Sequence, residues 1–201
     1  ILEKSSSILE MVETCQLRVS QKSLIEVTGP NILVAGCGTG QHSADTATRY
    51  QNSAVLAVDL SLSSLSYAKR KTDELGIKNI EYMQADILDL GNLKKQFDII
   101  ESVGVLHHMK DPMEGWTVLT DCLKPGGLMK VGLYSELARK HIVKMRKEIS
   151  KAGIGSSAVD MKSFRNVVMQ SDKDHHKVIL NAHDFYSLST LKDLLFHVQE
   201  H

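Results

Sequence analysis

The stretch Ile32-Leu33-Val34-Ala35-Gly36-Cys37-Gly38-Thr39-Gly40 decides the fold class of this chain. A short apolar run that ends in glycine is typical of a buried strand in a parallel sheet. Three glycines at alternate positions then allow a sharp turn and leave few side chains between the backbone and a ligand. A strand, a bare turn and a helix together form the ligand-binding corner of a doubly wound α/β domain.

Strand-like and helix-like segments alternate after this corner. Further strands are expected at 54–58, 80–83, 97–102 and 128–134, and helices at 41–50, 61–75, 112–123 and 135–151. Such alternation predicts an α/β fold with a mostly parallel sheet and right-handed crossovers.

The spacing of the glycines distinguishes two classes of cofactor. A dinucleotide fingerprint reads G-x-G-x-x-G, and here Gln41 stands where its third glycine would be. Gly36, Gly38 and Gly40 instead follow the spacing G-x-G-x-G, and this segment resembles the first motif of class I S-adenosylmethionine-dependent methyltransferases. A tight turn that binds nothing is the third reading.

The resemblance extends over five successive elements, from about Asn31 to Lys151. It implies a Rossmann-like three-layer sandwich with strand order 3-2-1-4-5 and S-adenosyl-L-methionine as cofactor. It places Asp59 on the two ribose hydroxyls, where a carboxylate is a suitable acceptor, and Asp86 with Ile87 beside the adenine. The cofactor-binding residues expected on this basis are Gly36, Cys37, Gly38, Thr39, Gly40, Asp59, Leu60, Asp86, Ile87, Ser102 and Val103.

Two segments, Glu101–His108 and Gly132–Arg139, show a closer resemblance to bacterial methyltransferase domains fused to tetratricopeptide repeats, although no such repeat is visible in this sequence. The chain also departs from the family twice. Val34 stands where the family usually has an acid near the methionine amino group, so that group could be held by backbone carbonyls instead, or bound less tightly. The antiparallel strand pair that closes the family's sheet is not found in 152–201, which reads as helices.

Two adjacent histidines follow the fourth strand and are the candidate catalytic residues. Methyl transfer from a sulfonium is an in-line displacement, so the protein mainly aligns donor and acceptor and excludes water. His108 or His107 would act as a general base only for an acceptor that enters protonated. The alternative is that they shape the pocket, and since adjacent side chains diverge, we expect at most one to serve the site.

The chain as a whole is expected to comprise an N-terminal helical segment at 1–30, a methyltransferase core at 31–151 and a helical extension at 152–201, in what reads as a trimmed piece of a longer protein. Its 24 Lys plus Arg balance 24 Asp plus Glu, so no overall field favours nucleic acid or a membrane surface. No apolar run is long enough to span a membrane. Three scattered cysteines suit reduced thiols in a cytoplasm.

Two groups of side chains could indicate other partners, but a simpler interpretation is preferred for each. A basic stripe could meet an acidic acceptor or RNA, but an amphipathic surface helix explains it: Lys140, Lys144, Lys147 and Lys151. The histidines near the C-terminus, including His175 and His176, show no ligand spacing, so no metal is expected.

The sequence thus predicts an S-adenosylmethionine-dependent methyltransferase acting on an unidentified small molecule or protein. The alternatives are a non-catalytic module that binds the cofactor and associates with proteins through its helical tail, and an NAD(P)-dependent oxidoreductase.

Overall fold

The computed structural model describes residues 7–16, 27–133 and 139–196. The chain divides into two compact units, Ile1–Leu133 and Tyr134–His201, and each is described by itself.

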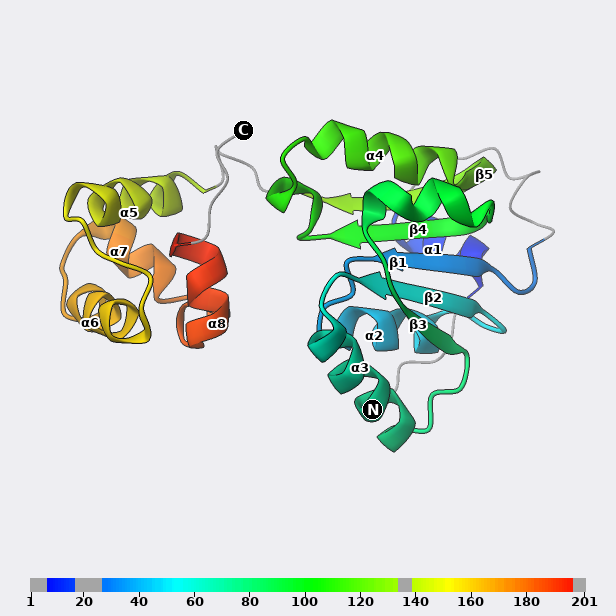
Figure 1. Cartoon of the computed structure of the whole chain (residues 1–201), viewed down its shortest axis with the longest axis horizontal. Helices are drawn as coiled ribbons and strands as arrows, with labels where there is room; N and C mark the ends of the chain where they lie inside the picture. The colour runs from blue at the N-terminus through cyan, green and yellow to red at the C-terminus, as the bar shows by residue number, and fades with distance from the viewer. Residues whose placement is uncertain (1–6, 17–26, 134–138, 197–201) are drawn as a thin grey trace. The chain divides into compact units, whose positions relative to one another are not determined.

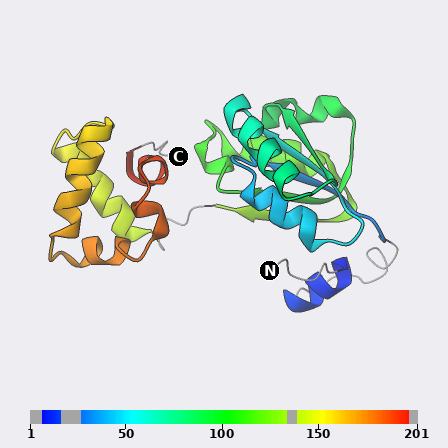
Figure 2. The ribbon, with the colours of Figure 1, turned by 90° about the horizontal axis from the view of Figure 1, so that it is seen from below.

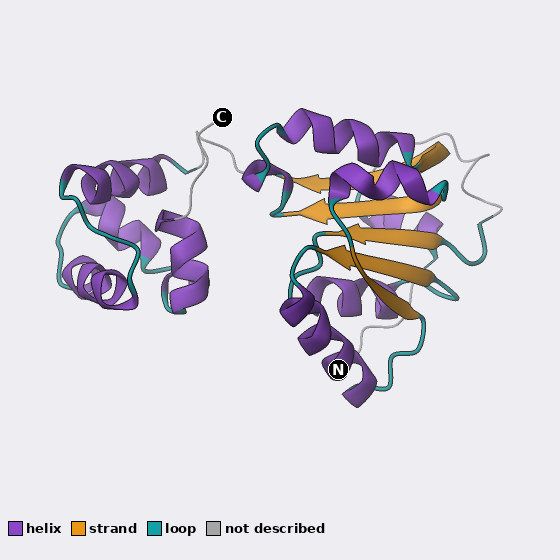
Figure 3. Ribbon diagram, viewed as in Figure 1, coloured by secondary structure: helices purple, strands orange, loops and turns teal. Residues whose placement is uncertain are grey.

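The first unit is built on a five-stranded sheet in the order β3-β2-β1-β4-β5 (Figure 1). The strands are β1 Asn31–Ala35, β2 Ala54–Asp59, β3 Ile80–Gln84, β4 Phe97–Val103 and β5 Leu123–Gly132. All neighbouring strands are parallel, so their carboxyl ends meet at one edge of the sheet (Figure 3). The predicted α/β class and strand order are confirmed.

Helices cover both faces of this sheet, which makes the predicted three layers (Figure 2). The helices packed on one face are α1 Ile8–Thr14, α2 Gln41–Arg49 and α3 Leu62–Glu74, and those on the other are η2 Ile87–Leu93 and α4 Pro112–Asp121. Side chains of β1 alternate between the two apolar clusters: Ile32 and Val34 join the first, Leu33 and Ala35 the second. This alternation is why the run reads as continuously apolar in the sequence.

Two segments at the ends of the first unit need comment. Of the helical segment expected at 1–30, α1 is described, and its Ile8 and Val12 are buried in the first cluster; residues 1–6 and 17–26 lie outside the described part. The fifth strand begins at Leu123 rather than at residue 128, because residues 124–127 form a bulge: Phe97 pairs with Leu123, and Ile99 with Leu128.

The second unit is helical over its described residues. Its elements are α5 Lys140–Lys151, α6 Ala158–Met169, α7 Asp174–Ile179, η4 His183–Phe185, α8 Leu188–Leu191 and the π-helical turn η5 Lys192–Phe196. No strand occurs within residues 158–196. None of the described helices in either unit is long and apolar enough to cross a membrane.

Helix α5 packs within the second unit. Its Ile142, Met145 and Ile149 are buried in one cluster with side chains of α6, α7 and α8. The contacts therefore divide the chain between Leu133 and Tyr134, whereas the sequence placed 31–151 together. The periodicity of a sequence shows that a helix buries one side, but it does not show which elements that side packs against. The four lysines of the basic stripe are all exposed, as a solvated face requires.

Candidate cofactor site

The turn after β1 holds three glycines with positive φ angles of 79°, 52° and 89°. A Cβ atom at Gly36 would lie 2.2 Å from Cγ2 of Val105, and one at Gly40 would lie 2.5 Å from Cβ of Ala68. A Cβ at Gly38 would meet nothing within 4 Å. The outer glycines therefore allow close packing, and the middle one faces open space where a ligand can approach the backbone.

Asp59, at the end of β2, is tied to this turn. Its Oδ2 accepts a hydrogen bond of 2.7 Å from the Gly38 N–H, and its Oδ1 accepts one of 2.9 Å from the Ser61 N–H. The side chain that caps α3 belongs to Ser61, not to Asp59. Each carboxylate oxygen takes only one of these N–H groups and keeps acceptor capacity for hydroxyls. Asp59 thus orders the turn and can still bind a ribose.

The ends of β2 and β3 lie side by side at the carboxyl edge. Gln84 Nε2 donates to the Leu60 carbonyl at 2.9 Å, and the Leu60 side chain is 66% exposed. Asp86 is partly buried and caps η2 by accepting from the Leu88 N–H at 3.0 Å. Ile87 is buried in the apolar cluster beneath η2, which leaves only its edge for contact with a ring.

Two predicted residues within the turn differ in character. Cys37 is buried, and this burial, together with the nearby charge of Asp59, raises the pKa of the thiol to about 12. Its thiol is therefore neutral at physiological pH and serves packing rather than nucleophilic chemistry. Thr39 is exposed beside Gly38 and Gly40.

Strand β4 ends next to the glycine turn. Val103 is 43% exposed at the edge, whereas Ser102 is fully buried. The following η3, Leu106–His108, is held near the turn by the contact of Val105 with Gly36.

The two candidate catalytic histidines lie on η3. Their ring centroids are 4.2 Å apart and the rings are tilted by 56°. Both nitrogens of the His107 ring are buried. The sequence predicted that the two adjacent side chains diverge, but their rings lie against each other on η3.

The sequence interpretation missed a buried acid on β4. Glu101 is 1% exposed; its Oε2 lies 2.9 Å from Nε2 of His42 and accepts a hydrogen bond of 2.5 Å from Oγ1 of Thr46. Burial alone would raise its pKa, but the His42 and Thr46 contacts hold the pKa of Glu101 below its ordinary value. An acid directly after Ile99 and Ile100, within the strand expected at 97–102, was the signal that could have revealed it.

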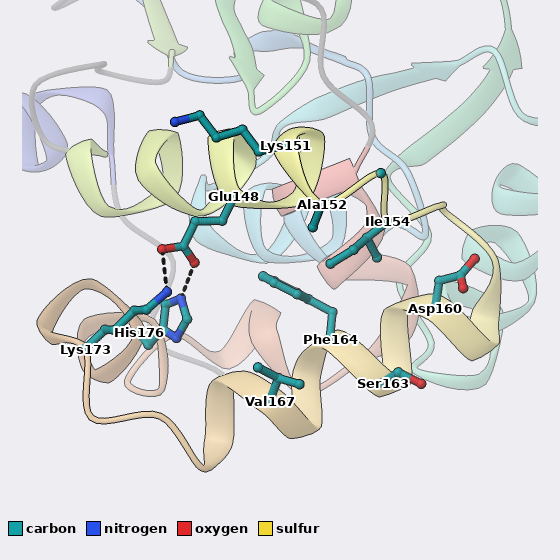
Figure 4. Close-up of a pocket in the computed structure, with 11 residues that line it drawn as sticks. Glu148, Lys151, Ala152, Ile154, Asp160, Ser163, Phe164, Val167, Lys173 and His176 are labelled. Atoms are coloured by element: carbon teal, nitrogen blue, oxygen red, sulfur yellow. Dashed lines mark hydrogen bonds and ion pairs between the residues drawn. The ribbon is translucent and has the colours of Figure 1, made fainter.

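A second polar cluster lies in the helical unit, beside a pocket of about 710 Å³ (Figure 4). Glu148 on α5 accepts hydrogen bonds from Lys173 at 2.8 Å, His175 at 3.0 Å and His176 at 2.7 Å. The ligand atoms of Glu148 and the two histidines lie within 4.8 Å of one another, a convergence that spacing in the sequence did not show. Three donors on one carboxylate account for this geometry without an ion.

The pKa of Glu148 makes this cluster testable by pH. Burial raises that pKa, but the hydrogen bonds from Lys173 and the two histidines lower it to about 2, from an ordinary value of 4.5. A lowered folded-state pKa stabilises the fold above pH 4.5, and this contribution is lost as the pH falls toward 2. We expect Glu148→Gln to lower the thermal unfolding midpoint at pH 6, and we expect the difference from the parent to shrink as the pH falls from 4.5 toward 2. Thermal unfolding of both proteins across this pH range measures the effect. A difference in midpoint that stays constant over the range would contradict the assignment.

Comparison with known proteins adds the family. A family described as "Methyltransferase domain" matches residues 32–127. A Synechococcus protein described as "Uncharacterized protein syc1184_c" is 35% identical over 60% of this chain and 29% of its own length. A Lactococcus lactis protein named "Demethylmenaquinone methyltransferase" is 28% identical over 87% of this chain and 67% of its own length. The chain thus spans less than a third of the first of these relatives.

The fold is also found among solved structures. The structure of PKMT2 from Rickettsia typhi in complex with AdoHcy superposes with a TM-score of 0.65, at 23% identity, over 81% of this chain and 35% of that one. Together with the strand order 3-2-1-4-5 and the open glycine turn tied to an acid, these matches identify the first unit. Residues 32–127 thus match a methyltransferase domain, and the activity that these findings support is S-adenosylmethionine-dependent methyl transfer to an acceptor that is unknown.

Proposed function

We propose that S-adenosylmethionine lies along the carboxyl edge of the sheet, with its adenine at Asp86 and its ribose at Asp59. The observation that supports this placement best is the Gly38 amide, which bonds to Asp59 while its Cα side faces open space. Leu60 and Val103 offer exposed apolar surface on either side of that turn. The remaining contacts come from the backbone at Gly36, Cys37, Thr39 and Gly40 and from the edge of Ile87. Ser102 is buried, so it would contribute only indirectly, by supporting the end of β4.

The same placement brings the reacting sulfonium near η3. The methionine end must run from β2 across the turn toward β4, because these strands are neighbours of β1 on opposite sides. His108 and His107 then stand near the methyl group, as general base or as walls of the acceptor site. The displacement itself needs alignment and exclusion of water more than proton transfer.

The acceptor we propose is a small molecule or a protein side chain in the cytoplasm. The balance of 24 basic and 24 acidic residues gives no support for a nucleic acid. A fusion to tetratricopeptide repeats stays a prediction; it depends on the segments at 101–108 and 132–139, and residues 134–138 of the second lie outside the described structure. The helical tail remains the candidate surface for protein association.

One titration experiment tests the cofactor and the histidines together. S-Adenosylmethionine and S-adenosylhomocysteine should bind to the parent, and NAD should bind negligibly, because Gln41 replaces the third glycine of the dinucleotide fingerprint. His107→Ala and His108→Ala should keep cofactor affinity if they act on the acceptor. Tighter binding of NAD would overturn the assignment, and loss of cofactor binding in both variants would make the histidines part of the cofactor pocket.

A further inference from the structure

Position 34 raises a question that the fold can answer. The acid expected there is replaced by Val34, which is buried in the cluster beneath α2. In the register of the parallel pair, the residue opposite Val34 on β4 is Glu101. Paired residues of adjacent strands point to the same face of a sheet. The carboxylate missing from β1 is therefore present one strand away, on the same face.

Glu101 is nevertheless too buried to meet a ligand itself. It is 1% exposed, and its Oε2 is covered by His42 and Thr46 from the first two turns of α2. Arg49, further along α2, lies 3.7 Å from Oε1, and Lys130 on β5 adds a more distant positive charge. Two partners of Glu101 are partly exposed, His42 at 31% and Arg49 at 28%, and of these His42 lies at the end of α2 next to the glycine turn.

The chemistry of the contact determines which nitrogen of His42 is presented. Nε2 is buried against the carboxylate of Glu101, which is ionised and can only accept. Nε2 must therefore carry the proton, and in the neutral ring Nδ1 is the acceptor. A carboxylate against one ring nitrogen in this way fixes the tautomer of the imidazole.

The location of His42 matches one end of the cofactor. It is the second residue of α2, which starts directly after the glycine turn, and its partner belongs to β4. With the adenine at β3 and the ribose at β2, the amino-acid end of the cofactor extends past β1 toward β4. An acceptor nitrogen there would suit the α-ammonium group.

We propose that His42, oriented by Glu101, binds the α-ammonium group of the methionine end of S-adenosylmethionine in place of the acid absent at position 34. This rests on the cofactor placement proposed above. His42 is the contact and Glu101 the positioning residue, so the two act as one unit. Replacing either residue should remove the same interaction with the α-ammonium group. Replacing both should therefore weaken cofactor binding little more than replacing one.

The test compares S-adenosylhomocysteine with 5′-methylthioadenosine, which shares the adenine, ribose and sulfur but lacks the amino-acid end. For His42→Leu and Glu101→Gln, calorimetric titration should show about tenfold weaker binding of S-adenosylhomocysteine, the value of one hydrogen bond to a charged group. Binding of 5′-methylthioadenosine should stay unchanged, which also reports that each variant is folded. The double variant should bind S-adenosylhomocysteine about as well as His42→Leu does.

Arg49→Met is the matched control, because it removes another partner of the same carboxylate at the far end of α2. It should keep the parent's preference for S-adenosylhomocysteine. An unchanged preference in His42→Leu, or an equal loss of both ligands, would overturn the inference. A parent protein that binds neither ligand would instead overturn the cofactor placement. His42→Leu alone decides the matter if Glu101→Gln does not fold.

Discussion

Asp59→Ala is expected to weaken S-adenosylmethionine binding by about 10²-fold or more. Two hydrogen bonds from ribose hydroxyls to an ionised acceptor contribute about 1.5–3 kcal/mol each, and 1.4 kcal/mol corresponds to a factor of ten. The loss has a second source in this structure, because the Gly38 amide would lose its acceptor and the turn would lose order. Calorimetric titration of the purified variant measures the effect.

Asp59→Asn separates the two roles of this residue. Asparagine offers one carbonyl oxygen, so its NH₂ group must face either the Gly38 or the Ser61 N–H group, both of which are donors. We expect at least a tenfold loss of affinity and about 1 kcal/mol lower stability. Asp73→Asn, an exposed acid on α3 paired with Lys69, is the matched control and should bind like the parent. An Asp59→Asn variant with parental affinity would remove Asp59 from the site.

Gly36→Ala is expected to destabilise the fold by about 2–5 kcal/mol. Its φ of 79° is unfavourable for any residue with a Cβ, and that Cβ would lie 2.2 Å from Val105. Conformational strain of about 1–2 kcal/mol and overpacking of about 1–3 kcal/mol combine here. Denaturant unfolding gives the loss directly, and movement of the Val105 segment should also reduce cofactor affinity.

Gly38→Ala provides the contrast. Its φ of 52° carries a similar conformational cost, but no atom lies within 4 Å of the added Cβ. We therefore expect a loss of stability of about 1–2 kcal/mol, with cofactor binding reduced because the methyl group enters the space reserved for the ligand. Equal stability losses in the two variants would show that packing against Val105 does not decide the conformation of the turn.

Local patterns in the sequence were enough to predict the fold of the first unit. A buried strand, an amphipathic helix and a glycine turn each have a signature within about ten residues, and their alternation limits the topology to few choices. Asp59 and Asp86 could be placed in the same way, because strand ends in a parallel sheet meet at one edge. The strand order 3-2-1-4-5 followed from the family resemblance.

Contacts between distant residues were settled only by the tertiary structure. Glu101 meets Thr46 across 55 residues of chain, and Glu148 meets His176 across 28, and neither pair has a spacing that marks it in the sequence. Helix α5 shows the same limit, since its apolar stripe fits a sheet or a helix cluster equally well. Side chains far apart in sequence interact according to how strands register and helices pack. The sequence thus determined the secondary-structure elements and the glycine turn of the cofactor site. Tertiary packing decided which charged side chains lie together.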